Sequence, residues 1–78
     1  MFFVYILRCS NNRLYVGCSS NIKDRMKRHI AGNVPATKNI LPVKLVFCAM
    51  FADKQLAFRF EKYLKSGSGR AFLKKRLI

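Results

Sequence analysis

The sequence predicts an α+β domain in which a three-stranded antiparallel sheet is flanked by helices, in the order ββαβαα. Two observations favour this class. Short runs rich in aromatic and β-branched residues surround a turn-forming "SNNR" segment, and two later segments repeat apolar residues at helical spacing. A chain of 78 residues with 51% hydrophobic content has room for only one core. We therefore expect residues 1–78 to form a single domain.

The first half of the predicted sheet is a hairpin, with strands at residues 2–9 and 14–18 around the turn at residues 10–13. Each strand carries a tyrosine. A two-residue loop would place Tyr5 and Tyr15 on opposite faces of the sheet, because side chains alternate along a strand. A three-residue loop or a bulge would place both on one face.

Residues 20–31 are predicted to form the first helix, and the spacing of Asn21 and Asp24 is that of a capping box. The apolar stripe of this helix consists of Ile22, Met26 and Ile30. Arg25 and His29 fall on one border of that stripe, between the expected core and solvent.

The second half of the chain supplies the third strand and two more helices. Residues 32–42 carry two prolines and are predicted to be a loop across one end of the sheet. The strand at residues 43–51 is almost continuously apolar, which predicts burial on both faces. A helix at residues 53–65 follows, then a linker at 66–69 and a short basic helix at 70–78. The stripe of the 53–65 helix consists of Leu56, Phe60, Tyr63 and Leu64.

Charge is the strongest compositional signal, since 16 Lys and Arg against 3 Asp and Glu give a formal net charge of +13. Such a chain suits a polyanionic partner, with nucleic acid as the first expectation and an anionic membrane surface as the second. The longest apolar run, residues 45–52, is too short to span a bilayer. We expect no membrane partner.

The cysteines and the N-terminus predict a cytoplasmic protein. The N-terminal run lacks both a basic leader and a cleavage site. Cys9, Cys18 and Cys48 are odd in number and form no CxxC pair, and the single histidine leaves no zinc spacing. We expect all three thiols to be free and to pack as small apolar groups.

Among the acids, Glu61 is the candidate for a metal ligand. Asp24 and Asp53 are explained by helix starts, where carboxylates interact with free N–H groups. Glu61 lies on the border of its helix stripe and has no such explanation. The alternative role for Glu61 is a surface ion pair with Lys65 at i, i+4.

The other candidates are weak when taken singly. A tyrosine in a strand is usually a core residue, and His29 alone carries no information. Gly17 indicates either a bulge or the close approach of another group. Residues 66–70 lack the pattern of a phosphate-binding loop.

Taken together, these residues resemble the GIY-YIG nuclease superfamily, in particular its small stand-alone bacterial members. "VYI" at residues 4–6 and "YVG" at 15–17 match the two motifs that name the family. Arg25 and His29 follow in the first helix, and Glu61 matches the family's metal-binding glutamate on the later helix. The resemblance covers nearly the whole chain.

The chain departs from the family pattern at three places. Val4 stands where the first motif has glycine, and Val16 where the second has isoleucine. The asparagine that several branches carry near the chain end has no match, since none follows Asn39. The contribution of the C-terminal segment is therefore not given by the resemblance.

The resemblance implies a metal-dependent endonuclease whose catalytic residues are Tyr5, Tyr15, Arg25, His29 and Glu61. Glu61 would hold one divalent cation, Mg²⁺ or Mn²⁺. Arg25 would stabilise charge on the phosphoryl oxygens. The tyrosines would position or deprotonate water, with His29 assisting, provided that the nearby cations, Arg25 and the metal, lower their pKa. A shared site requires both tyrosines on one face of the sheet, so we expect an odd-length loop or a bulge near residues 11–13. The products would carry a 3′-hydroxyl and a 5′-phosphate.

DNA is the expected substrate, with RNA as an alternative. We expect weak sequence preference, with recognition by charge, by strand structure or by a protein partner that supplies specificity, and a monomer or weak dimer. The predicted phosphate contacts are Lys23, Lys27, Arg28, Lys38, Arg70, Lys74 and Lys75. Two rival interpretations are a noncatalytic nucleic-acid-binding module of the same fold and a basic structural protein of a ribonucleoprotein.

Overall fold

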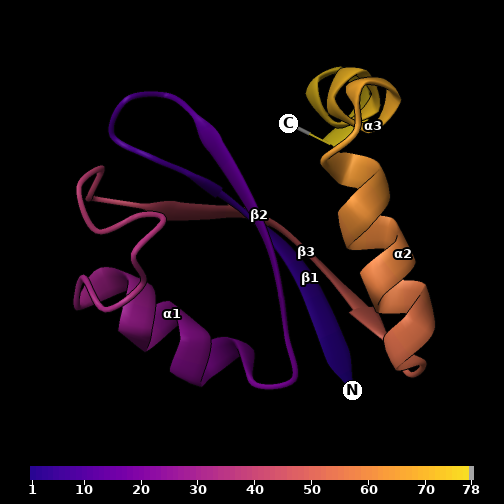
Figure 1. Ribbon diagram of the computed structural model, residues 1–78, viewed down its shortest axis with the longest axis horizontal. Coiled ribbons are helices and arrows are strands. Elements are labelled where there is room, and N and C mark those ends of the chain that lie inside the picture. The colour runs from indigo at the N-terminus through magenta and orange to yellow at the C-terminus, as the bar shows by residue number, and fades with distance from the viewer. Residues whose placement is uncertain (78) are drawn as a thin grey trace.

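The computed structural model of the protein describes residues 1–77 and confirms the predicted α+β class (Figure 1). Its three strands form one antiparallel sheet in the order β2-β1-β3. The helices α1 and α2 lie on opposite sides of this sheet (Figure 1). The elements in chain order are β1 (Phe2–Arg8), β2 (Leu14–Ser19), α1 (Ile22–Ile30), β3 (Lys44–Phe51), α2 (Lys54–Leu64), α3 (Gly67–Phe72) and the π-helical turn η1 (Leu73–Leu77).

The register of the hairpin places its two tyrosines on the same face of the sheet. Tyr5 lies opposite Gly17, and Leu7 lies opposite Tyr15. Residues opposite each other share a face, as do residues two apart along a strand. Tyr5 and Tyr15 therefore point to the same side, as a site that uses both requires.

A three-residue loop produces this register. The Cys9 amide donates to the Arg13 carbonyl at 2.9 Å, which leaves residues 10–12 as the loop. The Asn12 amide closes a turn on the Cys9 carbonyl, and Asn12 itself has a φ of 65°. Asparagine is one of the few residues that accept this left-handed conformation readily. The prediction of an odd-length loop is confirmed.

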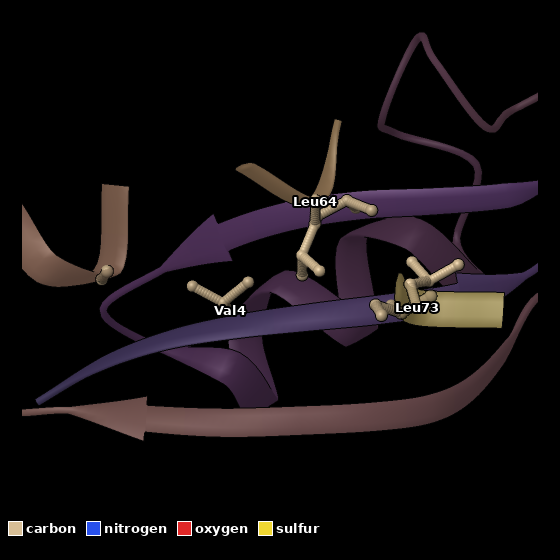
Figure 2. Close-up of a cluster of buried hydrophobic side chains, with 6 residues drawn as sticks. Val4, Leu64 and Leu73 are labelled. Atoms are coloured by element: carbon tan, nitrogen blue, oxygen red, sulfur yellow. The ribbon is translucent and has the colours of Figure 1, made fainter. Parts of the chain in front are cut away.

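The hydrophobic core lies between the sheet and the α2–α3 layer. Val4 and Ile6 from the central strand meet Leu64 and Leu73 from the helical layer, and all four are at most 2% exposed (Figure 2). Alternation along β1 sends Val4 and Ile6 to this face and Tyr5 and Leu7 to the other. The core therefore fixes the direction in which the tyrosines point.

The prediction that residues 43–51 are buried on both faces is wrong. This segment forms β3, which is an edge strand with half of its residues exposed. Leu45 is 40% exposed and Met50 is 64% exposed. The doubly buried strand is β1, because it lies in the middle of the sheet with helices on both sides.

The predicted stripe of α1 is rotated in the structure. The Asn21 cap is confirmed, since its Oδ1 accepts from the Asp24 amide at 3.0 Å. Ile30, however, is 65% exposed, whereas His29 is fully buried. The side of α1 that carries Arg25 and His29 faces the sheet, because His29 forms a hydrogen bond with Tyr5 of β1.

The stripe of α2 is also rotated. Ala57 and Leu64 are fully buried, Phe60 packs against the core, and two predicted core residues, Leu56 and Tyr63, are 50% and 42% exposed. Phe60 stacks at a tilt against the Phe51 ring of β3, 5.5 Å away. The contact between these two rings turns the Phe60 side of α2 towards the sheet.

Residues 66–69, predicted to be a linker, instead begin α3. The Ser66 side chain caps this helix by accepting from the Gly69 amide at 3.1 Å. Gly69 lies against the backbone carbonyl of Tyr63 so closely that a side chain would collide with it. Glycine therefore allows α3 to fold back sharply onto α2, and the predicted basic helix starts earlier than expected.

The three cysteines are free, as predicted, but differ in burial. Cys9 is buried, Cys18 is half-buried and Cys48 is exposed on the edge strand. The expectation of an apolar packing role therefore fails for Cys48. Within residues 1–77, no helix combines the length and the apolar content that crossing a bilayer requires.

Candidate active site

The face of the sheet opposite the core carries a cluster of Tyr5, Tyr15 and His29. The centroid of the His29 ring lies 5.7 Å from that of Tyr5 and 5.2 Å from that of Tyr15, and the two tyrosine rings are 6.3 Å apart. Strands β1 and β2 bring in the tyrosines, while α1 brings the histidine across the sheet. Three residues predicted from separate elements thus meet at one place.

A buried hydrogen-bond chain joins Tyr5 and His29 to Thr37, a residue that the sequence did not identify as part of the site. Tyr5 Oη lies 2.9 Å from His29 Nε2, and His29 Nδ1 lies 2.8 Å from Thr37 Oγ1. All three residues are fully buried. Thr37 lies in the loop at residues 32–42, where no periodicity or motif distinguishes it from its neighbours. This contact fixes the orientation of the imidazole ring.

Gly17 is required by the position of the Tyr5 ring. A Cβ atom at position 17 would fall 2.9 Å from Tyr5 Cε1 and closer still to Cζ and Oη. The phenol therefore lies across the glycine, and no larger residue leaves it room. Of the two roles that the sequence allowed for Gly17, the structure shows the close approach.

Burial controls the protonation of the cluster. It raises the pKa of Tyr5 to about 12, with the neighbouring Tyr15 adding to the rise and Arg25 opposing it. The pKa of His29 is lowered, first by burial and then by Arg25 and Arg28. Both side chains are therefore neutral near pH 7. Arg25 alone does not offset the cost of burying a phenolate at Tyr5.

Arg25 and Glu61 act electrostatically on Tyr5 from opposite layers of the fold. Arg25 is half-buried on α1, and its charge acts on both Tyr5 and His29. Glu61 on α2 is near enough for its carboxylate to raise the pKa of Tyr5 and of Cys18. The two charges therefore act on the pKa of Tyr5 in opposite directions, with Arg25 lowering it and Glu61 raising it.

The Glu61 carboxylate also forms the ion pair that was its alternative role. Lys65 Nζ lies 3.2 Å from Glu61 Oε2, and the Glu61 side chain is 23% exposed. An exposed i, i+4 pair of this kind contributes only about 0.3–0.5 kcal/mol. A stronger cation could displace the lysine at little cost.

Glu61 fits a divalent cation that takes most of its ligands from elsewhere. Among residues 1–77, no group of three or more His, Cys, Asp and Glu side chains could hold a metal ion. Mg²⁺ usually keeps several waters and binds through one or two carboxylates plus substrate phosphates. A single partly exposed carboxylate is compatible with that mode.

The predicted phosphate contacts are all exposed and fall into two groups. The first group lies on α1 and the loop that follows it, and the second on α3 and η1 in the other layer. The first consists of Lys23, Lys27, Arg28 and Lys38, and the second of Arg70, Lys74 and Lys75. The structure does not bring the two groups onto one face.

Comparison with known proteins supports the resemblance drawn from the motifs. The family model described as the GIY-YIG catalytic domain matches residues 1–76. A UPF0213 protein of Staphylococcus haemolyticus is 40% identical over 73 residues, which cover 92% of this chain and 89% of that protein. A UPF0213 protein of Clostridium perfringens is 39% identical over 66 residues, covering 83% of this chain and 71% of that protein.

The fold has a solved counterpart. The solution NMR structure of the UPF0213 protein BH0048 from Bacillus halodurans superposes with a TM-score of 0.61 at 30% sequence identity. The match covers 96% of this chain and 84% of that one. Since the family model spans almost the entire chain and the relatives match over most of their length, the protein belongs to the GIY-YIG family.

Proposed function

We propose that this protein is a metal-dependent endonuclease that hydrolyses DNA phosphodiester bonds with weak sequence preference. The observation that carries the proposal is the cluster of Tyr5, Tyr15 and His29 on one face of the sheet, in which the charges of Arg25 and Glu61 also act on Tyr5. Family membership supports nuclease chemistry. The net charge of +13 suits a nucleic-acid substrate.

In this proposal, the Tyr5–His29–Thr37 chain moves a proton away from the attacking water. With its hydrogen on Nδ1, neutral His29 donates to Thr37 Oγ1 and accepts the Tyr5 hydroxyl hydrogen at Nε2. The Tyr5 oxygen can then accept a proton from water as its own passes to Nε2. The raised pKa of Tyr5 makes this coupled transfer easier than forming a free phenolate.

The remaining residues position the substrate and stabilise charge. Tyr15 limits where the water can sit, because its ring closes one side of the Tyr5–His29 pair. Arg25 donates to phosphoryl oxygens, a role that suits its planar fork of donors. Glu61 would hold the divalent cation, which when bound stabilises charge on the phosphate and its leaving oxygen.

The test incubates the protein with supercoiled plasmid and with end-labelled single-stranded, duplex and branched DNA, in Mg²⁺ or Mn²⁺ and in EDTA. Glu61→Gln should lower the cleavage rate by about 10²-fold or more while DNA binding is retained. Asp24→Asn is the matched control, since it removes an exposed carboxylate from a helix start and should cleave normally. Equal cleavage by Glu61→Gln and the control would contradict the role of Glu61.

A noncatalytic DNA-binding module is the second candidate, and the Glu61–Lys65 ion pair is the observation that favours it. In that case binding is tight, falls steeply with salt, and is accompanied by no cleavage on any substrate. An affinity that stays flat between low and physiological salt would contradict phosphate-driven binding in both candidates. Parallel RNA probes decide between DNA and RNA.

A further inference from the structure

The outer edge of β3 is open. This strand pairs with β1 on one side, and among residues 1–77 no strand pairs with its other side. No described backbone hydrogen bond outside the sheet involves residues 44–51 either. Alternate residues along this edge therefore present backbone N–H and C=O groups to solvent. An edge of this kind can take up a further strand.

The side chains beside this edge form an exposed apolar row on one face of the sheet. Leu45, Cys48 and Met50 lie opposite alternate residues of β1, so all three point to the face that carries Tyr5. Leu45 is 40% exposed, Met50 is 64% exposed, and Cys48 is also exposed. A strand added to β3 would place its own side chains of that face against this row. Apolar residues are therefore favoured there.

An apolar hollow lies at the N-terminal end of the same strand. Its volume is about 500 Å³, and it is lined by Ile30 at the end of α1 and by Leu41, Pro42 and Val43, which directly precede β3. Ile30 is 65% exposed, so this hollow is open to a visiting side chain. A strand added along β3 that continues beyond Lys44 reaches it. In strand addition, backbone pairing gives affinity and a pocket for a side chain gives specificity.

The other face of the sheet is cationic at that same end of β3. Lys44 lies opposite Arg8, and both residues are exposed. Alternation along the strands points both side chains away from the face that carries Tyr5. Neither β1, nor β3, nor the loop at residues 31–43 contains an acidic residue. A carboxylate opposite Lys44 on an added strand would therefore lie beside that lysine, with Arg8 next in the row.

We propose that the outer edge of β3 binds an extended segment of a partner protein in which apolar and acidic residues alternate. The apolar side chains lie over Leu45, Cys48 and Met50 and enter the hollow, and a carboxylate lies beside Lys44. A second copy of this chain fits less well, because each copy carries +13 and its β3 has no acidic residue. Since β2 forms the opposite edge of the sheet, the docked segment leaves Tyr15 accessible. The inference goes beyond the proposed function and does not depend on it.

The test titrates isotope-labelled protein with a synthetic peptide and follows the backbone amide signals by NMR. The peptide has the length of β3, 8 residues, and alternates valine and glutamate. One companion peptide carries lysine in place of every glutamate. Two others carry N-methyl groups on one or the other set of alternate residues, and only one of these sets supplies the N–H donors that face β3. The mixture contains no nucleic acid, so the result is independent of nuclease activity.

A pair of matched variants tests the hollow and its neighbouring cation. The edge variant is Ile30→Ala with Lys44→Ala. Its control is Phe58→Ala with Lys62→Ala on α2, which also removes one exposed apolar side chain and one positive charge but lies outside the hollow and β3. The edge variant should bind the valine–glutamate peptide about threefold or more weakly than the control does. Thermal melting shows whether each variant is folded, and the peptide comparisons on the wild type decide the question without them.

The amide signals of residues 44–51 should shift, together with those of Ile30, Leu41 and Val43, while those of residues 14–19 in β2 stay in place. The acidic peptide should bind about tenfold more tightly than the lysine peptide. One N-methylated peptide should bind about tenfold more weakly than the other. Equal affinity of the two N-methylated peptides, or shifts that avoid residues 44–51, would overturn the proposal. Shifts of residues 44–51 that follow the protein concentration without peptide would assign the edge to a second copy and overturn it as well.

Discussion

Replacing Gly17 by alanine tests the contact between this residue and Tyr5. The new Cβ would lie 2.9 Å from Tyr5 Cε1. Carbon atoms in contact prefer a separation of about 3.5–4.0 Å, so the ring must move by at least about 0.6 Å. Tyr5 is fully buried and hydrogen-bonded to His29, so it has no free space to move into. Such overpacking typically costs about 1–3 kcal/mol of unfolding free energy.

The expected loss of stability in Gly17→Ala is opposite in sign to the usual effect of this substitution in a strand. An alanine in a strand is normally more stable than a glycine by about 0.5–1 kcal/mol, so a stability loss at this site must come from the ring. The displaced hydroxyl should also lower the rate of DNA cleavage, by up to about 10²-fold if the shift reaches 1 Å. Urea denaturation followed by circular dichroism gives the stability, and single-turnover cleavage gives the rate.

Two comparisons control the experiment. Gly67→Ala introduces the same atom at a position where it meets nothing within 4 Å, and should leave stability and rate unchanged or slightly raise stability. In a Tyr5→Leu background, which lacks the ring, Gly17→Ala should become neutral or stabilising. If Gly17→Ala costs the same free energy in both backgrounds, the contact with Tyr5 is not the reason for the glycine.

Two further predictions concern the buried hydrogen-bond chain. Thr37→Val keeps the shape of the side chain but leaves His29 Nδ1 without its partner, so unfolding free energy should fall by about 1–3 kcal/mol and cleavage should slow, whereas Thr37→Ser should restore both. An unchanged melting midpoint for Thr37→Val would refute the contact. His29 is the single histidine of the chain, and its pKa is lowered on folding. The unfolded chain therefore binds more protons below about pH 6.5, so stability should be full above that pH and decline as the pH falls, by at most about 1.4 kcal/mol per pH unit. His29→Gln should flatten this decline in urea midpoints measured from pH 7.5 to 5.5, and an equally steep decline in that variant would assign it elsewhere.

The sequence predicted the order of the elements because their local signals are strong. The Asn21 cap, the hairpin turn and the helical periodicities depend on residues close together in the chain. The family motifs added the five candidate residues of the site, and the structure brings three of them, Tyr5, Tyr15 and His29, together. The loop length could be inferred from Tyr5 and Tyr15 because side chains alternate along a strand. Only an odd-length loop or a bulge places both tyrosines on one face.

The failed predictions for β3, α1 and α2 all concern which side of an element is buried. The apolar content of β3 suggested a central strand, but strand order depends on pairing between distant segments, and β1 takes the centre. The four-residue spacing of Ile22, Met26 and Ile30 predicts a buried Ile30, yet the fully buried residue of α1 is His29. A histidine can be buried when both ring nitrogens have partners, and its partner Thr37 lies in a loop with no recognisable pattern.

The open edge of β3 has a consequence for how copies of the protein behave in solution. Unpaired backbone groups along an edge strand, with Leu45 and Met50 exposed beside them, are a template for pairing with another chain. Lys44 is the only charged residue within this strand, so local protection is slight. The mutual repulsion of molecules that each carry +13 opposes such pairing. That repulsion acts over about 8 Å at physiological ionic strength and shrinks as salt rises. Concentrated salt, or a polyanion that neutralises the surface, therefore weakens the repulsion that opposes pairing at this edge.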